Sequence, residues 1–124
     1  VAAAFDRVEA DLGPVDILVL AAGIFVVEPF EATTPASWRR TMEVCLDAAF
    51  LCTARVLPGM RERRYGRIVV LGSSAGVTGG TRNCAAYGAA KAGIMTLAKA
   101  IANEYAPHGV TANALAPALP FLGL

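Results

Sequence analysis

The stretch RIVVLG, residues 67–72, holds an uninterrupted run of apolar side chains, mostly β-branched, from Ile68 to Leu71 and ends at Gly72. Runs of this length and composition are typical of strands that are covered on both faces, as in parallel sheets. Parallel strands need a long crossover connection between them, usually a helix. We therefore predict a buried strand at this stretch, with helices before and after it in the chain.

The residues before this strand predict two helices and another strand. Apolar residues recur at helical spacing over residues 4–12, a Gly-Pro pair stops the run, and the apolar stretch VDILVLA follows at residues 15–21. Thr34 and Pro35 are a good N-cap and first-turn pair for a second helix. We expect that helix to span residues 35–60, with one apolar side.

The residues after the strand repeat the alternation. A loop rich in Gly, Ser and Thr over residues 72–81 leads to a third helix at residues 85–106, and VTANALAP, residues 110–117, is a third strand. Strands that alternate with helices of this length imply βαβ units. We therefore predict an α/β fold, a partial Rossmann-like doubly wound parallel sheet of about three strands, in one domain over residues 1–124.

Composition argues against several classes of protein. Hydrophobic residues make up 56% of the 124 positions, but the longest uncharged apolar run, residues 17–27, is shorter than the ~18 residues of a membrane-spanning helix. The net charge is +1, and no basic stripe indicates a nucleic-acid partner. One histidine and three scattered cysteines predict no metal site. The odd number of cysteines favours a reducing compartment, and we expect a cytoplasmic protein.

Tyr87 and Lys91 are four residues apart, so on a helix they share one face. A nearby ammonium stabilises a phenolate, which makes a tyrosine more effective in acid-base catalysis near neutral pH. Ser73 follows the quoted strand at the edge of the sheet where ligands bind in open parallel sheets. Together these groups suit the interconversion of a carbonyl and an alcohol, with Ser73 orienting the oxygen and Tyr87 exchanging its proton.

Five motifs in order along the chain resemble those of the short-chain dehydrogenase/reductase family. They are VDILVLAAG (15–23), EVCLDAAFLCTARVLPGM (43–60), GRIVVLGSSAG (66–76), YGAAKAG (87–93) and GVTANALAP (109–117). The family's counterparts are the DILVNNAG strand, the helix that ends in LPxM, the serine strand, the YxxxK helix and the strand that ends in Pro-Gly. This resemblance implies an NAD(P)-dependent oxidoreductase that interconverts a small alcohol and a carbonyl by hydride transfer.

The resemblance also implies roles for single residues. Tyr87 would donate or accept the proton, Lys91 would support Tyr87 and bind the nicotinamide ribose, and Ser73 would polarise the carbonyl. The cofactor, NAD or NADP, would also contact Ala21, Ala22 and Gly23 on its adenosine side and Pro117 and Ala118 on its nicotinamide side. For the serine, counting from the flanking glycines favours Ser73, whereas the family's usual spacing to the tyrosine favours Ser74, and we choose Ser73.

Several positions depart from the family's pattern. No glycine-rich phosphate loop occurs in the chain, and the glycines over residues 72–80 lack its spacing, so we interpret them as a substrate-side loop. Cys45 replaces an asparagine, Leu20 and Ala21 replace the two asparagines of NNAG, and Ala118 replaces a glycine. We therefore expect a fragment that lacks the family's N-terminal glycine-rich part and its C-terminal substrate region.

Two alternatives to this enzyme stay open. One is a catalytically silent remnant that acts only through association of its helices. The other is a family member that uses the same scaffold for dehydration or epimerisation. The resemblance further implies a homo-oligomer formed through the helices at residues 35–60 and 85–106.

Overall fold

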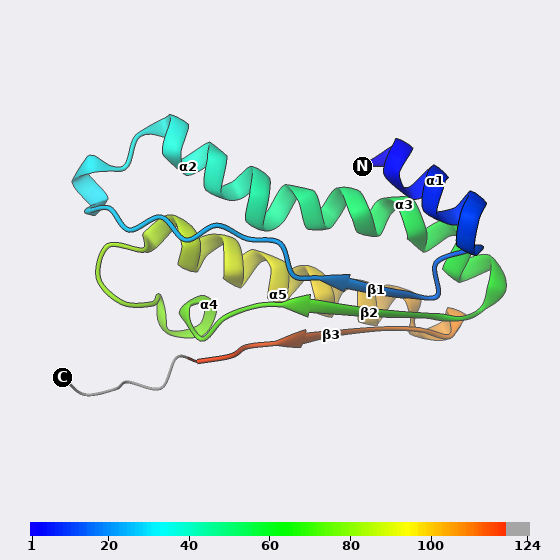
Figure 1. Ribbon diagram of the computed structural model, residues 1–124. Coiled ribbons are helices and arrows are strands. Elements are labelled where there is room, and N and C mark those ends of the chain that lie inside the picture. The colour runs from blue at the N-terminus through cyan, green and yellow to red at the C-terminus, as the bar shows by residue number, and fades with distance from the viewer. Residues whose placement is uncertain (119–124) are drawn as a thin grey trace.

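Three parallel strands form the sheet of the computed structural model, which describes residues 1–118. They are β1 (Ile17–Leu20), β2 (Gly66–Leu71) and β3 (Val110–Leu115), in the order β1-β2-β3 (Figure 1). The register places Leu18 opposite Ile68 and Ile68 opposite Ala112. The quoted stretch is thus the central strand, and the predicted parallel α/β arrangement is confirmed.

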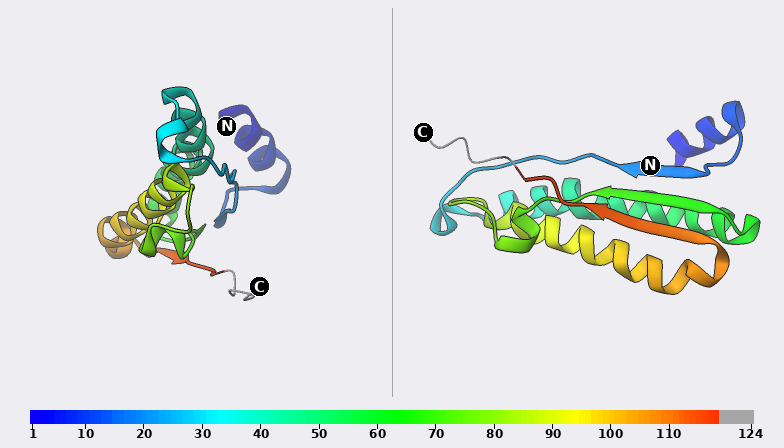
Figure 2. Two further views of the ribbon diagram at one scale, coloured as in Figure 1. Left: turned by 90° about the vertical axis from the view of Figure 1, so that its left-hand side faces the viewer. Right: turned by 90° about the horizontal axis from the view of Figure 1, so that it is seen from below.

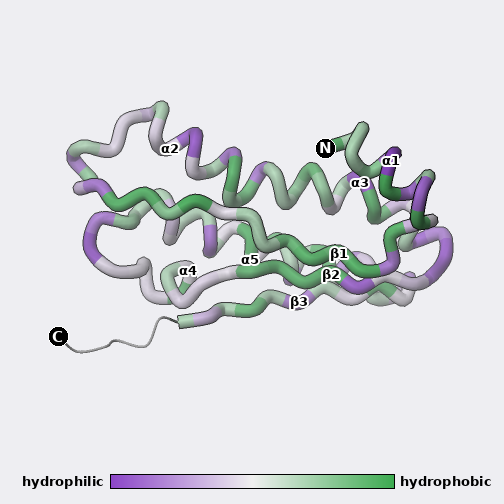
Figure 3. The backbone as a smooth tube through the Cα atoms, viewed as in Figure 1, coloured by the Kyte–Doolittle hydropathy of each residue, from purple (hydrophilic) through white to green (hydrophobic). Residues whose placement is uncertain are grey.

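Two long helices, α3 (Ala48–Arg63) and α5 (Ala85–Tyr105), pack on one face of this sheet (Figure 2). Met60 on α3 and Ile94 on α5 are fully buried in one core with Ile68 and Val70 of β2. Apolar residues follow one another along β1 and from Ile68 to Leu71 of β2, whereas in β3 they alternate with Thr111 and Asn113 (Figure 3). The inward-facing apolar residues of the strands exclude water together with the apolar stripes of the two helices.

The opposite face of the sheet differs from the prediction made for residues 67–72. Arg67, Val69 and Leu71 point away from the core and are only half-buried. Beside them, Ile17 and Val19 of β1 are 61% and 58% exposed. A continuous apolar run shows that both faces of the strand are apolar, but within residues 1–118 helices cover only one of the two faces.

The predicted helix over residues 35–60 is interrupted. α2 (Pro35–Met42) leads into a π-helical turn (Glu43–Asp47) before α3 begins. The start of α2 is as expected, because the Thr34 hydroxyl accepts a hydrogen bond from the Ser37 amide and Pro35 occupies the first turn. A π turn inserts one residue into the helical repeat, so it turns Cys45 toward the core at 1% exposure.

α1 (Ala2–Leu12) forms where predicted but has no fully buried residue. Its link to α3 is the Arg55 guanidinium, whose nitrogen lies 2.7 Å from Asp6 Oδ1 and 2.7 Å from Glu9 Oε2. These two hydrogen bonds raise the pKa of Arg55, and the bond to Asp6 has the larger effect. The remaining short elements are two 3-10 turns (Phe30–Ala32 and Ala106–His108) and α4 (Ala75–Thr78).

Candidate functional site

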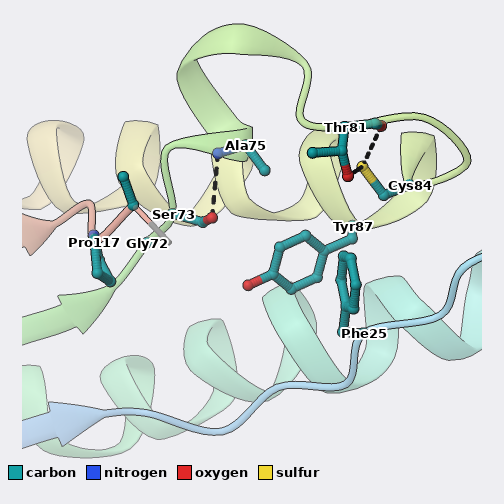
Figure 4. Close-up of a pocket in the computed structure, with 9 residues that line it drawn as sticks. Phe25, Gly72, Ser73, Ala75, Thr81, Cys84, Tyr87 and Pro117 are labelled. Atoms are coloured by element: carbon teal, nitrogen blue, oxygen red, sulfur yellow. Dashed lines mark hydrogen bonds between the residues drawn. The ribbon is translucent and has the colours of Figure 1, made fainter. Parts of the chain in front are cut away.

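The carboxyl ends of the three strands meet at one edge of the sheet and supply three segments to it. β1 continues into residues 21–25, β2 into Gly72 and Ser73, and β3 into Pro117. The amino-terminal half of α5 lies beside this edge and brings Tyr87 to it (Figure 4). Ligand sites of open parallel sheets lie at this edge, so the fold positions these residues for chemistry.

Lys91 is 4% exposed, and its ammonium donates a hydrogen bond to the Leu71 carbonyl at 2.5 Å. Its nitrogen lies 5.6 Å from the centroid of the Tyr87 ring, as expected for residues one turn apart on α5. An ammonium has three donors, and this bond uses one. A buried cation whose remaining donors face a cavity beside a phenol is well placed to hold polar groups of a ligand.

The two adjacent serines after β2 have different surroundings. Ser73 lines a cavity together with Tyr87, and its oxygen accepts a hydrogen bond from the Ala75 amide at 3.1 Å (Figure 4). Ser74 uses its own amide to bond the Pro117 carbonyl at 3.1 Å, and its carbonyl accepts from the Thr78 hydroxyl. The geometry therefore favours Ser73 as the serine that faces a ligand.

Tyr87 lines two adjoining cavities. The first, about 400 Å³, is lined by Phe25, Gly72, Ser73, Ala75, Thr81, Cys84, Tyr87, Pro117 and Ala118. The second, about 270 Å³, is lined by Ala21, Gly23, Ile24, Phe25, Leu71, Gly72, Tyr87, Lys91 and Pro117. Small-molecule sites commonly have volumes of this order. Ser73 thus lines the first cavity, Lys91 lines the second, and Tyr87 lines both.

The predicted cofactor residues divide among three places. Ala21, Gly23 and Pro117 line the second cavity. Ala22 lines a separate apolar cavity under β1, and Ala118 lines the first cavity beside Ser73. The predicted contacts therefore line three cavities, and two of these adjoin Tyr87.

Gly76 of the 72–80 loop and Gly88 of α5 allow close packing of α4 on α5. A Cβ at Gly76 would lie 2.7 Å from the Ala92 nitrogen, and one at Gly88 would lie 3.2 Å from the Ala75 carbonyl oxygen. Side chains at these positions would force the two helices apart. Backbone contact beside the first cavity thus explains these two glycines.

Cys45 is held against the segment that follows β1. The Ile24 amide donates to the Cys45 sulfur at 3.3 Å, and the thiol donates to the Ile24 carbonyl at 3.4 Å. A Cβ on Gly23 would lie 3.7 Å from the same sulfur and 3.6 Å from the Lys91 nitrogen. The thiol is thus a packed group with two backbone partners, next to the second cavity.

Phe25, Thr81 and Cys84 line the first cavity, although none of them was among the predicted site residues. The Phe25 ring meets the Tyr87 ring edge to face, with centroids 4.8 Å apart and planes at 80°. The Cys84 thiol donates to the Thr81 carbonyl at 2.7 Å (Figure 4). An aromatic residue two positions after a strand-end glycine was the signal available for Phe25.

Among residues 1–118, no cluster of histidine, cysteine or carboxylate side chains has the arrangement of a metal site. The described helices also include none that is long and apolar enough to cross a bilayer. The three cysteines, Cys45, Cys52 and Cys84, are free thiols.

Comparison with known sequences gives a family match over nearly the whole chain. The model of the short chain dehydrogenase family matches residues 1–120. Nodulation protein G of Azospirillum brasilense is 46% identical over 113 residues, which cover 90% of this chain and 45% of that protein. An acetoacetyl-CoA reductase of Rhizobium meliloti (strain 1021) is 47% identical over 113 residues, which cover 90% of this chain and 46% of that enzyme.

Solved structures agree with this match. An oxidoreductase of the short chain dehydrogenase/reductase family from Burkholderia thailandensis superposes with a TM-score of 0.84 at 41% identity. The superposition covers 95% of this chain and 46% of that one. The chain thus spans less than half the length of the relatives that it matches.

Proposed function

The chain belongs to the short chain dehydrogenase family, and on that premise we propose that the protein interconverts an alcohol and a carbonyl by NAD(P)(H)-dependent hydride transfer. Ser73, Tyr87 and Lys91 are the proposed catalytic residues. The similarity to an acetoacetyl-CoA reductase, by its name an enzyme that reduces a carbonyl compound, supports a carbonyl substrate.

One observation carries the proposal: Tyr87 lines both a cavity that contains Ser73 and a cavity that contains Lys91. In Figure 4 the hydroxyl end of Tyr87 is directed toward the side of the first cavity formed by Gly72, Ser73 and Pro117. A carbonyl oxygen bound there can meet both hydroxyl groups. The nicotinamide ring of a dinucleotide bound in the second cavity would lie against the same tyrosine.

Bound NAD(H) or NADP(H) would supply or accept the hydride. In the reductive direction negative charge develops on the carbonyl oxygen, where the Tyr87 hydroxyl donates its proton and the Ser73 hydroxyl donates a hydrogen bond. The Ser73 oxygen already accepts a bond from the Ala75 amide, which leaves its hydrogen free for the substrate. The Lys91 ammonium then stabilises the phenolate that remains on Tyr87. In the oxidative direction the same groups act in reverse.

The residues of the second cavity fit the nicotinamide-ribose end of such a cofactor. Lys91 spends one donor on Leu71, so two remain for ribose hydroxyl groups. Ala21 and Gly23 have little or no side chain and leave the backbone open to a flat ligand. This proposal covers NAD and NADP alike, because the fit concerns the part that the two share.

The test is turnover by the natural gene product, with NADH or NADPH and a panel of ketones including acetoacetyl-CoA, followed by nicotinamide absorbance. We expect Tyr87→Phe to lower kcat by about 10²- to 10⁴-fold, the usual contribution of a general acid-base group. Tyr65→Phe is the matched control, since Tyr65 is 44% exposed and precedes β2, at the opposite edge of the sheet. The proposal is ruled out if the natural gene product turns over none of the carbonyl compounds, or if the Tyr87→Phe variant keeps full activity.

A second candidate function is association alone, without catalysis. The outer side of α3 favours it, because Phe50 and Leu51 are 55% and 50% exposed there. A cavity between α3 and α5 adjoins Phe50 and is lined by Ala54, Leu97 and Ala100 among others. In the enzyme the same surface would join copies of the chain into the homo-oligomer inferred from the resemblance, so turnover is the measurement that separates the two functions.

A further inference from the structure

Phe25 is the most exposed aromatic side chain at the two cavities, with 56% of its surface accessible. It lines both of them, as Tyr87 does. Its edge-to-face contact with Tyr87 leaves more than half of the surface of Phe25 accessible to a ligand. Large exposed aromatic groups in a concave site commonly contact the ligand.

The backbone around Phe25 is fixed on both sides. On one side, the Ile24 amide and carbonyl both bond the Cys45 thiol, which is buried. On the other, the Glu28 amide donates to the Asn83 carbonyl at 2.8 Å, and the Ser37 hydroxyl donates to Glu28 Oε1 at 2.6 Å. These hydrogen bonds fix the segment on both sides of Phe25 and keep its ring against Tyr87.

The chemistry of the first cavity is uncharged. The described residues that line it include no Lys, Arg, His, Asp or Glu side chain. Lys91 lines the second cavity and is already bonded to Leu71, and Arg82, next to Thr81, is exposed and does not line the first. The hydroxyl groups that line it are those of Ser73, Thr81 and Tyr87, and the pair Ser73 and Tyr87 suits a single carbonyl or alcohol oxygen.

From these observations we propose that Phe25 is a specificity-determining residue, whose ring makes the first cavity select carbonyl compounds and alcohols with a flat, uncharged, apolar or aromatic substituent. This rests on the proposed function, which supplies the reacting oxygen at Ser73 and Tyr87. A ring of the substrate packs against the Phe25 side chain in the first cavity, and its oxygen points at the hydroxyl groups of Ser73 and Tyr87. A carboxylate in the place of that ring would lose its hydration without gaining a cation among the lining residues.

The experiment measures binding without cofactor, so that it can fail separately from turnover. The isotope-labelled chain is titrated with para-methylacetophenone and with para-acetylbenzoate, two ketones of similar shape that differ in charge, and amide shifts are followed by NMR. We expect the neutral ketone to shift the Ser73, Thr81 and Tyr87 signals and to bind at least about tenfold more tightly than the anion. Equal binding of the two ketones, or no binding of the neutral one, overturns the proposal.

Variants test the part played by Phe25 itself. Phe25→Ala should weaken binding of the neutral ketone by about three- to tenfold, the range expected for loss of one aromatic contact. Phe25→Leu keeps an apolar side chain but has no flat ring. Its affinity for the neutral ketone should therefore lie between those of the parent chain and Phe25→Ala. Phe30→Ala is the matched control, because Phe30 is 74% exposed and lines neither cavity. If Phe25→Ala binds the neutral ketone as well as Phe30→Ala does, Phe25 is not the determinant.

If the neutral ketone binds as expected but the natural gene product turns over no carbonyl, the proposed function fails and the cavity's selectivity stands. If turnover occurs but both ketones bind equally, only the inference about Phe25 fails. Both residues exchanged for alanine are more than half exposed, so neither substitution is expected to unfold the chain.

Discussion

Ser73 and Ser74 are neighbours in the chain, but only Ser73 lines the cavity at Tyr87. A hydroxyl that donates to a developing oxyanion contributes on the order of 10²-fold to kcat. We therefore predict that Ser73→Ala lowers kcat of the natural gene product about 10²-fold, whereas Ser74→Ala changes it by less than about threefold. The measurement is a steady-state ketone reduction assay on both variants. The reverse order of the two effects would assign the catalytic role to Ser74.

Cys45 joins the helical layer to the segment that carries Phe25. Its thiol makes two hydrogen bonds to Ile24, and Cys45→Ala removes both. We predict that Cys45→Ala speeds amide exchange at Ile24 by at least about tenfold, since each ten in rate corresponds to 1.4 kcal/mol of local opening. Cys45→Ser keeps a donor and an acceptor at nearly the same place, so it should restore most of the protection.

The readout for Cys45 is hydrogen exchange followed by NMR, residue by residue. Cys52→Ala is the control, because Cys52 is a half-buried thiol on α3, seven residues after Cys45, whereas the thiol bonded to Ile24 is that of Cys45. Equal protection of Ile24 in Cys45→Ala and in the parent chain would mean that the thiol does not hold this segment.

At the scale of single residues, features that depend on local spacing could be predicted from the sequence, whereas features that depend on tertiary contacts could not. Tyr87 and Lys91 are one turn apart on a real helix, because i and i+4 positions share a face whatever the rest of the fold does. Cys45, which replaces an asparagine of the family's pattern, is a buried and packed residue. Phe25 escaped prediction, since its position depends on bonds from Cys45 and Asn83, which are distant in sequence.

At the scale of elements, two glycines have φ in the left-handed region, but only one of them lies so close to a neighbour that a Cβ would overlap it. Their alanine variants therefore distinguish the cost of backbone strain from the cost of steric overlap. Gly109 has φ +73° before β3, and a Cβ there would overlap the Arg64 carbonyl oxygen. Gly79 has φ +85° after α4, with open space around its Cα. We predict that Gly109→Ala lowers the free energy of unfolding by about 3 kcal/mol and Gly79→Ala by about 1 kcal/mol.

Urea unfolding of the purified chain, followed by circular dichroism, measures both changes. The difference between the variants reports the overlap with Arg64, because both glycines share nearly the same φ and the strain that it causes. Equal losses in the two variants would show that the turn between α5 and β3 relaxes without cost.

Boundaries and regular periods of the elements followed from sequence, but interruptions did not. Thr34 and Pro35 predicted the start of α2 because capping is local. The π turn at Glu43–Asp47 and the short helix Ala75–Thr78 have no such signal, since each depends on packing against other elements. The apolar pattern of residues 67–72 predicted a strand correctly but not which of its faces the described residues cover.

At the scale of the whole molecule, two apolar surfaces are exposed. One is the outer side of α3, with Phe50 and Leu51. The other is the sheet face that α3 and α5 leave uncovered within residues 1–118, with Ile17 and Val19 of the edge strand β1. Exposed apolar patches of this kind commonly mark places where another protein surface binds. Either surface can support self-association, and they are far enough apart in the chain to be changed separately.

The homo-oligomer inferred from the family resemblance uses the helical surface, and this leads to a prediction. We predict that the purified chain is a dimer or larger at micromolar concentration, and that Phe50→Glu shifts it toward the monomer by at least about tenfold in Kd, because a carboxylate would be buried against apolar side chains. Light scattering coupled to size exclusion gives the mass, and Val77→Glu is the control, since Val77 is 70% exposed on α4.

The outcome also decides between the two apolar surfaces. Because Val19 lies on the sheet face, Val19→Lys should leave the mass of a helix-mediated oligomer unchanged. If instead Val19→Lys yields the monomer and Phe50→Glu does not, the sheet face is the one that associates. In that case the helical surface would be free, and the inference drawn from the family for the helices at residues 35–60 and 85–106 would be wrong for this chain. A monomeric parent chain would reject both surfaces as sites of self-association.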